Sequence, residues 1–97
     1  MTRAEAQKRL RRLPGWKLSP NRKAIRRDYV LKDFVAAVEL IRRIAVRAEK
    51  AGHHPDLHLT GYRKLKVVLS THDSGGLTLK DFRLAAEIEG LPKKPRS

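Results

Sequence analysis

Hydrophobic and polar positions follow two different periods along this chain. Between residues 34 and 48, apolar side chains recur at steps of three and four, the spacing of one face of an α-helix. This stripe comprises Phe34, Val38, Ile41, Ala45 and Ala48, and it is widened by Ala37, Leu40 and Ile44. Gly52 follows, and glycine tolerates the left-handed backbone at which helices commonly end. The pattern predicts a long helix that packs on a sheet and offers a second apolar surface to another subunit.

Residues 64–71 instead alternate with a period of two, which is typical of a strand. One face carries Leu65, Val67 and Leu69, and the opposite face carries Lys64, Lys66, Val68 and Ser70. Turn residues separate three further predicted strands, at 16–18, 25–30 and 57–60. A first helix is predicted at 2–13. A last helix is predicted from Thr78, with Asp81 at the capping-box spacing, to Gly90.

The order helix, strand, strand, helix, strand, strand, helix predicts an α+β fold, α-β-β-α-β-β-α. In it a four-stranded antiparallel sheet carries the helices packed on one face. The 97 residues contain no repeat and no linker, so we expect a single domain over 1–97. Residues 92–97 are expected to form a mobile tail. One face of such a sheet lacks a covering layer, and oligomerisation is an ordinary way to supply it.

The composition is strongly basic, with 23 Lys and Arg against 10 Asp and Glu, a formal net charge of +13. Such a surface favours nonspecific, salt-sensitive binding of polyanions. A phosphate-binding surface would draw on Arg9, Arg11, Arg12, Arg22, Lys23, Arg26 and Arg27. The charge therefore favours one of two classes of function, a basic nucleic-acid-binding or transcription-cofactor-like interaction protein, and the other class is an enzyme. Only 5% of residues are aromatic, and no recognition helix is evident.

Other classes are excluded by what the sequence lacks. Without cysteine, the chain has no disulfide, no thiolate nucleophile and no Cys-based zinc site. No stretch approaches the roughly 20 apolar residues that span a bilayer, and no apolar leader follows Met1. We therefore expect a cytoplasmic protein without membrane contact.

Four histidines, His53, His54, His58 and His72, are the candidate acid–base groups, because imidazole gives and takes protons near neutrality. Pro55 restricts His54 to extended backbone, so the rings of the His53–His54 doublet leave in different directions. The doublet either wraps a ligand or forms two solvated loop residues. His58 alternates with leucines and is interpreted as a plain sheet-face residue. The parity of His72 places it at the surface or in a cleft.

Two carboxylates are ambiguous from position alone. Glu49 lies in the last helical turn, where the helix dipole disfavours an acid, yet an ordinary surface glutamate paired with an arginine explains it. Capping alone explains Asp81. A metal site drawn from His53, His54, His72 and Glu49 is not expected, because adjacent histidines rarely point at one ion.

Taken together, several segments resemble the pterin-4a-carbinolamine dehydratases, a family known in animals also as the dimerisation cofactor of a homeodomain factor. The segments are Glu49-Lys50-Ala51-Gly52-His53-His54-Pro55, Tyr62, Leu69-Ser70-Thr71-His72-Asp73, Gly76-Leu77-Thr78 and Asp81, with Trp16 and Lys32-Asp33-Phe34 upstream. The chain departs from the family pattern at Leu57, where many members have an aromatic residue, and at Arg63, where asparagine is common.

The resemblance implies a hydro-lyase that removes water from 4a-hydroxytetrahydropterin to give quinonoid dihydropterin, in tetrahydrobiopterin-type cofactor recycling. It implies His53, His54 and His72 as the acid–base and pterin-binding groups. The residues implied to bind substrate or orient the histidines are Glu49, Pro55, Thr71 and Asp81. It also implies a homodimer or homotetramer, and neither a metal nor an organic cofactor.

Overall fold

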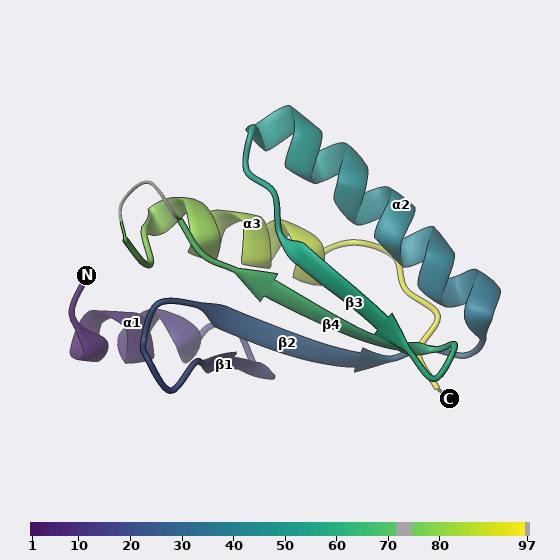
Figure 1. Cartoon of the computed structure of the whole chain (residues 1–97), viewed down its shortest axis with the longest axis horizontal. Helices are drawn as coiled ribbons and strands as arrows, with labels where there is room; N and C mark the ends of the chain where they lie inside the picture. Colours follow the sequence, from purple (N-terminus) through teal and green to yellow (C-terminus); the bar gives the residue numbers. More distant parts are fainter. Residues whose placement is uncertain (72–74, 97) are drawn as a thin grey trace.

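The computed structural model describes residues 1–71 and 75–96 and confirms the predicted element order (Figure 1). The elements are α1 (Arg3–Leu10), β1 (Trp16–Leu18), β2 (Ile25–Val30), α2 (Phe34–Ala51), β3 (Asp56–Thr60), β4 (Lys64–Leu69) and α3 (Leu79–Glu89). The strands form one sheet in the spatial order β1-β2-β4-β3, and each neighbouring pair is antiparallel. The predicted α+β fold is therefore confirmed.

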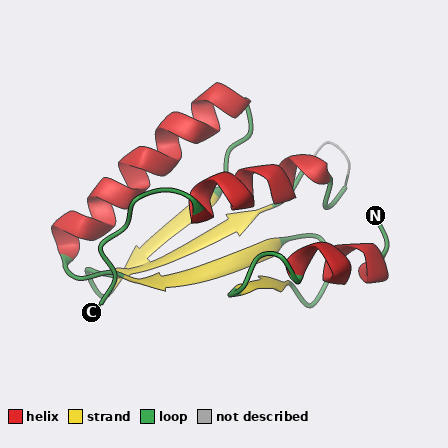
Figure 2. Ribbon diagram, turned by 180° about the vertical axis from the view of Figure 1, so that it is seen from behind, coloured by secondary structure: helices red, strands yellow, loops and turns green. Residues whose placement is uncertain are grey.

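Helices α2 and α3 cover one face of the sheet, and α1 lies beside β1 at one end of the molecule (Figures 1 and 2). The inward face of β4 was predicted correctly, since Leu65, Val67 and Leu69 are all buried. On the opposite face Lys66 lies between Asp28 of β2 and His58 of β3. His58 is exposed there, as expected for a plain sheet-face residue.

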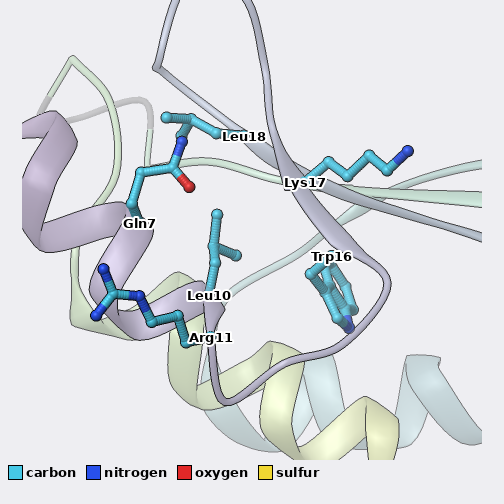
Figure 3. A pocket seen from close by; sticks show the side chains of 6 residues that line it. All are labelled: Gln7, Leu10, Arg11, Trp16, Lys17 and Leu18. Atoms are coloured by element: carbon cyan, nitrogen blue, oxygen red, sulfur yellow. The ribbon is translucent and has the colours of Figure 1, made fainter.

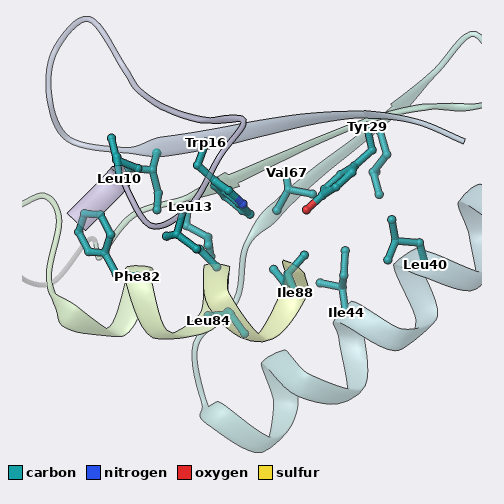
Figure 4. Close-up of a cluster of buried hydrophobic side chains, with 14 of the residues drawn as sticks. Leu10, Leu13, Trp16, Tyr29, Leu40, Ile44, Val67, Phe82, Leu84 and Ile88 are labelled. Atoms are coloured by element: carbon teal, nitrogen blue, oxygen red, sulfur yellow. The ribbon is translucent and has the colours of Figure 1, made fainter. Parts of the chain in front are cut away.

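The hydrophobic core lies between the sheet and the helices (Figure 4). Helix α2 contributes Ala36, Ala37, Leu40, Ile44 and Ala48 to it. The broad stripe predicted for α2 is thereby divided in two. The residues that widen it, such as Leu40, face the sheet, whereas Phe34 and Val38 remain 54% and 45% exposed. Helix α2 thus keeps the second apolar surface that the sequence predicted.

The ends of α1 and α2 show how local sequence sets the helix lengths. Helix α1 was predicted to reach Leu13, but its α-helical part ends at Leu10. After that the Arg12 and Leu13 N–H groups donate to carbonyls three residues back, at 3.2 and 3.0 Å. Pro14 disfavours helical backbone in the residue before it, which explains this tightening. Helix α2 ends as predicted at Gly52, whose φ of 64° lies in the left-handed region.

The mobility of the C-terminal tail stays a prediction, but backbone hydrogen bonds attach this segment to the strand end. The Lys32 N–H donates to the Lys94 carbonyl at 2.8 Å, and the Arg96 N–H donates to the Val30 carbonyl at 3.1 Å. Pro95 forms a bridge with Leu31. Among the described residues, no helix combines the length and apolarity needed to cross a bilayer.

Candidate acid–base site

His53 and Asp81 are brought together by the end of one helix and the start of another. The left-handed Gly52 turns the chain out of α2, and the His53 N–H donates back to the Ala48 carbonyl at 3.1 Å. Asp81 lies in the first turn of α3, which Thr78 caps. As a result His53 Nε2 lies 2.6 Å from Asp81 Oδ1, although the residues are 28 positions apart. The predicted capping role of Asp81 is confirmed and is only part of its function in the fold.

Asp81 is fully buried and takes part in three hydrogen bonds. Besides His53, the Thr71 hydroxyl donates to Oδ2 at 2.7 Å, and the Thr78 N–H donates to Oδ2 at 3.0 Å. Thr71 and Thr78 also share a hydrogen bond between their hydroxyls at 2.8 Å. A buried carboxylate is tolerated only when such partners replace its lost hydration. The network therefore fixes Asp81 rigidly against the imidazole of His53.

The hydrogen-bond inventory assigns the protons in this network. Because the single hydroxyl proton of Thr71 goes to Asp81, the bond between the two threonines must use the Thr78 proton. When Asp81 is ionised its oxygens only accept, and His53 Nε2 is then the donor in the bond between them. This leaves His53 Nδ1 as the ring nitrogen that can exchange a proton with a substrate. A buried carboxylate behind a histidine both orients the ring and balances a positive charge on it.

His54 and Glu49 form a second, exposed pair. His54 Nε2 is hydrogen-bonded to Glu49 Oε2, and the two side chains are 63% and 75% exposed. The expectation that Glu49 pairs with an arginine was wrong, because its carboxylate reaches His54 one turn beyond the helix end. Exposed ion pairs contribute little to stability, typically at most about 1 kcal/mol. The pair leaves both groups accessible to solvent and to a ligand.

Of the remaining predicted site residues, the structure describes Thr71 and Pro55. Thr71 follows β4 and bridges to Gly76 by two backbone hydrogen bonds, of 2.9 and 3.2 Å. Pro55 is half-buried between the histidine doublet and β3. His72 lies outside the described residues. Within the described part of the chain no three His, Cys, Asp or Glu side chains are grouped as for a metal ion, and the expectation of a metal-free site stays a prediction.

Two surface pockets lie elsewhere on the chain, and neither His53 nor His54 lines them. One of about 390 Å³ lies beside α1 and β1, where Figure 3 shows Leu10 and Trp16 among its lining residues. Another, of about 400 Å³, is lined partly by Thr71, Ser70 and Lys23. His54 and Glu49 themselves lie on an exposed part of the surface of the single chain.

Known proteins are similar to this chain in sequence and in fold. The family described as "Pterin 4 alpha carbinolamine dehydratase" matches residues 1–91. A relative from Acidobacterium capsulatum, named "Putative pterin-4-alpha-carbinolamine dehydratase", is 45% identical over 91 residues, which cover 94% of this chain and 96% of the relative. The chain belongs to the pterin-4a-carbinolamine dehydratase family. The resemblance carried by the His-His-Pro and Thr-His segments is thereby confirmed.

Further comparisons place the chain within this dehydratase family. A mitochondrial pterin-4-alpha-carbinolamine dehydratase of Arabidopsis thaliana is 41% identical over 93 residues, covering 94% of this chain and 50% of the relative. Dehydratases of this name are hydro-lyases. The crystal structure of a transcriptional coactivator/pterin dehydratase from Brucella melitensis superimposes with a TM-score of 0.86 at 35% identity, covering 92% of this chain and 94% of the other.

Sequence reasoning missed a second cluster of polar groups, centred on Glu89, of whose members only Trp16 stood in the family resemblance. Glu89 Oε1 accepts from Trp16 Nε1 at 2.8 Å, from Arg27 Nε at 3.2 Å and from the Tyr29 hydroxyl at 2.5 Å. The Arg27 guanidinium also lies 4.6 Å from the centre of the Tyr29 ring. Arg27 is therefore an internal partner of Glu89, which removes it from the predicted phosphate-binding surface.

The same cluster changes the acidity of its members. Burial raises the pKa of Tyr29, and the neighbouring Glu89 carboxylate raises it further. For Glu89 burial acts to raise the pKa, but the hydrogen bonds from Tyr29, Trp16 and Arg27 together outweigh it, and the pKa is lowered. Glu89 is the last residue of α3, where the dipole disfavours an acid. That mismatch is the signal by which sequence analysis finds it.

Proposed function

We propose that this protein dehydrates a pterin-4a-carbinolamine, 4a-hydroxytetrahydropterin, to quinonoid dihydropterin and water. The observation that carries the proposal is the buried Asp81 held against His53, on the family's own motif. A histidine oriented in this way has one defined nitrogen for proton exchange. Family membership supplies the substrate class, and the histidine–aspartate pair supplies the acid–base chemistry.

The reaction needs two proton transfers, which two histidines perform. One imidazolium donates a proton to the hydroxyl on the carbinolamine carbon, and that hydroxyl leaves as water. A neutral imidazole accepts the proton that a ring N–H of the pterin loses. The substrate therefore loses one water, and the two histidines together hold as many protons after the reaction as before, with the proton moved from one to the other. We assign the two transfers to the set His53, His54 and His72, with Glu49 orienting His54 and with Thr71 and Asp81 orienting His53. Pro55 lines the substrate site beside the doublet.

The histidine assignment is tested by following the dehydration of synthetic 4a-hydroxytetrahydropterin by absorbance. We expect His53→Ala, His54→Ala and His72→Ala each to lower kcat by roughly 10²-fold, the usual size of a general acid–base contribution. His58→Ala is the matched control, because His58 is exposed on the opposite face of the sheet. Equal rates in wild type and in the doublet variants, or an equal loss in His58→Ala, would exclude these roles.

We further propose that the protein is a homo-oligomer that buries the free face of α2. Four apolar side chains on this helix are 45–64% exposed, namely Phe34, Val35, Val38 and Val46. An apolar stripe of this kind on a helix marks an association surface. Sedimentation velocity tests the proposal. Val38→Glu is expected to yield monomers, whereas Arg26→Glu on the uncovered sheet face leaves the wild-type mass. A monomeric wild type at micromolar concentration refutes it.

The cytoplasmic location and the salt-sensitive binding of polyanions remain parts of this proposal. The net charge of +13 supports the polyanion binding. Binding of this kind is expected to weaken steeply between about 50 and 200 mM salt for any duplex sequence. Sequence-selective binding that persists at the higher salt would favour the alternative of a nucleic-acid-binding protein.

A further inference from the structure

A groove of about 630 Å³ lies between α1 and α3, away from His53 and His54. Its walls are one stripe of each helix. Helix α1 and the turn after it supply Glu5, Lys8, Arg9 and Arg12, and α3 supplies Leu79, Phe82, Arg83 and Ala86. Within each set the positions run i, i+3, i+4 and i+7, the spacing of a single helical face. Leu13, from the segment after α1, also lines the groove, and Figure 4 shows it with Phe82 among the core side chains.

The chemistry of the groove is divided between an apolar floor and a cationic rim. Leu79 is 40% exposed and Ala86, about two turns further along α3, is also exposed, so the α3 side offers accessible apolar surface. The rim carries four exposed cations, Lys8, Arg9, Arg12 and Arg83, against the single carboxylate of Glu5. Among the described residues, the arginines that form ion pairs are other ones, namely Arg27, Arg43 and Arg47.

We propose that this groove binds an acidic amphipathic helix of a partner protein, about two turns long. Seven residues of helix rise about 10 Å, so each wall matches two turns of a third helix laid along it. Apolar side chains of the bound helix contact Leu79 and Ala86. Its flanking carboxylates face the four rim cations, and this charge complementarity sets the orientation of the complex.

Other occupants fit the groove less well. An apolar floor does not contribute to binding a nucleic acid backbone, because phosphates form contacts only with the cations. An acyl chain needs a slot that encloses it, but Leu13 and Phe82 at the base are only 8% and 7% exposed. A second copy of this chain has few carboxylates to face the four rim cations, since 23 Lys and Arg stand against 10 Asp and Glu.

The test uses a fluorescein-labelled, end-capped model peptide of roughly 16 residues, long enough for appreciable helix content. It carries Leu at i, i+3 and i+7 and Glu on both flanks, and anisotropy at moderate salt reports its binding to the full chain. We expect Arg83→Glu to weaken binding roughly tenfold, since it reverses a rim charge. Arg26→Glu is the matched control, because it makes the same charge change on the uncovered sheet face.

Two further comparisons test the apolar floor. We expect Leu79→Gln, and separately a peptide with Gln in place of Leu, to weaken binding at least roughly threefold. Circular dichroism melting verifies that each variant is folded. The proposal is overturned if the acidic peptide does not bind, or if Arg83→Glu and Arg26→Glu weaken it equally. It is also overturned if neither Gln substitution weakens peptide binding, or if Arg83→Glu weakens the binding of a DNA duplex and not that of the peptide.

Discussion

Glu89 offers the sharpest test of how the fold is held together, through the conservative change Glu89→Gln. Its Oε1 atom receives three donors, from Trp16, Arg27 and Tyr29, at 2.5–3.2 Å. Glutamine keeps an acceptor oxygen but loses the charge that strengthens each bond by about 1 kcal/mol. Because the Glu89 side chain is 29% exposed, solvent screening reduces the total, and we expect a loss of about 2 kcal/mol.

Thermal unfolding followed by circular dichroism measures this loss. For a domain of this size, about 2 kcal/mol corresponds to a fall in Tm of roughly 8–16 °C. Glu87→Gln is the matched control on the same helix. Among residues 1–71 and 75–96, Glu87 forms an ion pair with Arg47 alone, at 3.7 Å, and both side chains are more than 40% exposed. We expect that variant to change stability by less than about 0.5 kcal/mol.

The pH dependence gives an independent test of the same reasoning. Because the pKa of Glu89 is lowered from its usual value of 4.5, its contribution is fully present above that pH. The contribution is lost as the pH falls through the lower, folded value. The stability difference between wild type and Glu89→Gln should therefore be constant near neutrality and shrink below about pH 4. Equal melting of Glu89→Gln and Glu87→Gln, or a difference that persists unchanged at pH 3, would refute the account.

Two other substitutions test the acid–base site and the helix end before it. Asp81→Asn places an amide among hydrogen-bond donors, so it reverses the proton position on His53. We expect kcat in the dehydration assay to fall roughly 10²-fold. We expect thermal melting to show a loss of stability of about 1–3 kcal/mol. A Tm and kcat equal to those of wild type would contradict this. Gly52→Ala meets no atom within 4 Å but must keep a φ of 64°. We expect Gly52→Ala to lower the free energy of unfolding by about 1 kcal/mol, and Gly52→Asn to lower it by less. A Tm that falls in the order Gly, Asn, Ala indicates that the backbone conformation, and not side-chain packing, sets the cost.

The fold was predictable because its signals are local. The alternation in β4 identified the buried face, and Gly52 identified the end of α2. The α2 stripe was identified but not divided, because Leu40 and Val38 are both apolar and lie on adjoining parts of one helix. Only the packed sheet decides which part is buried. Local sequence cannot supply that information, since it depends on where β2 and β4 lie.

The candidate site was predictable as a set of residues and not as a set of contacts. His53, Thr71 and Asp81 stood in the motif, but their hydrogen bonds join the end of α2, the end of β4 and the start of α3. Capping was a sufficient explanation for Asp81 from its position. The second oxygen of the carboxylate is what makes the residue serve both purposes. Oδ2 completes the capping box while Oδ1 remains for the histidine.

Glu49 and Glu89 break the same local rule with different consequences. Both are acids in the last turn of a helix, where the dipole disfavours them. Glu49 remains exposed and meets His54 five residues away. Glu89 is half-buried and meets donors 60 to 73 residues away. An acid in the last turn of a helix thus identifies a residue whose partner lies beyond its own helix. The two residues differ in how far along the sequence that partner lies. Glu49, with its nearby partner, stays at the surface, whereas Glu89, with its distant partners, joins α3 to β1 and β2.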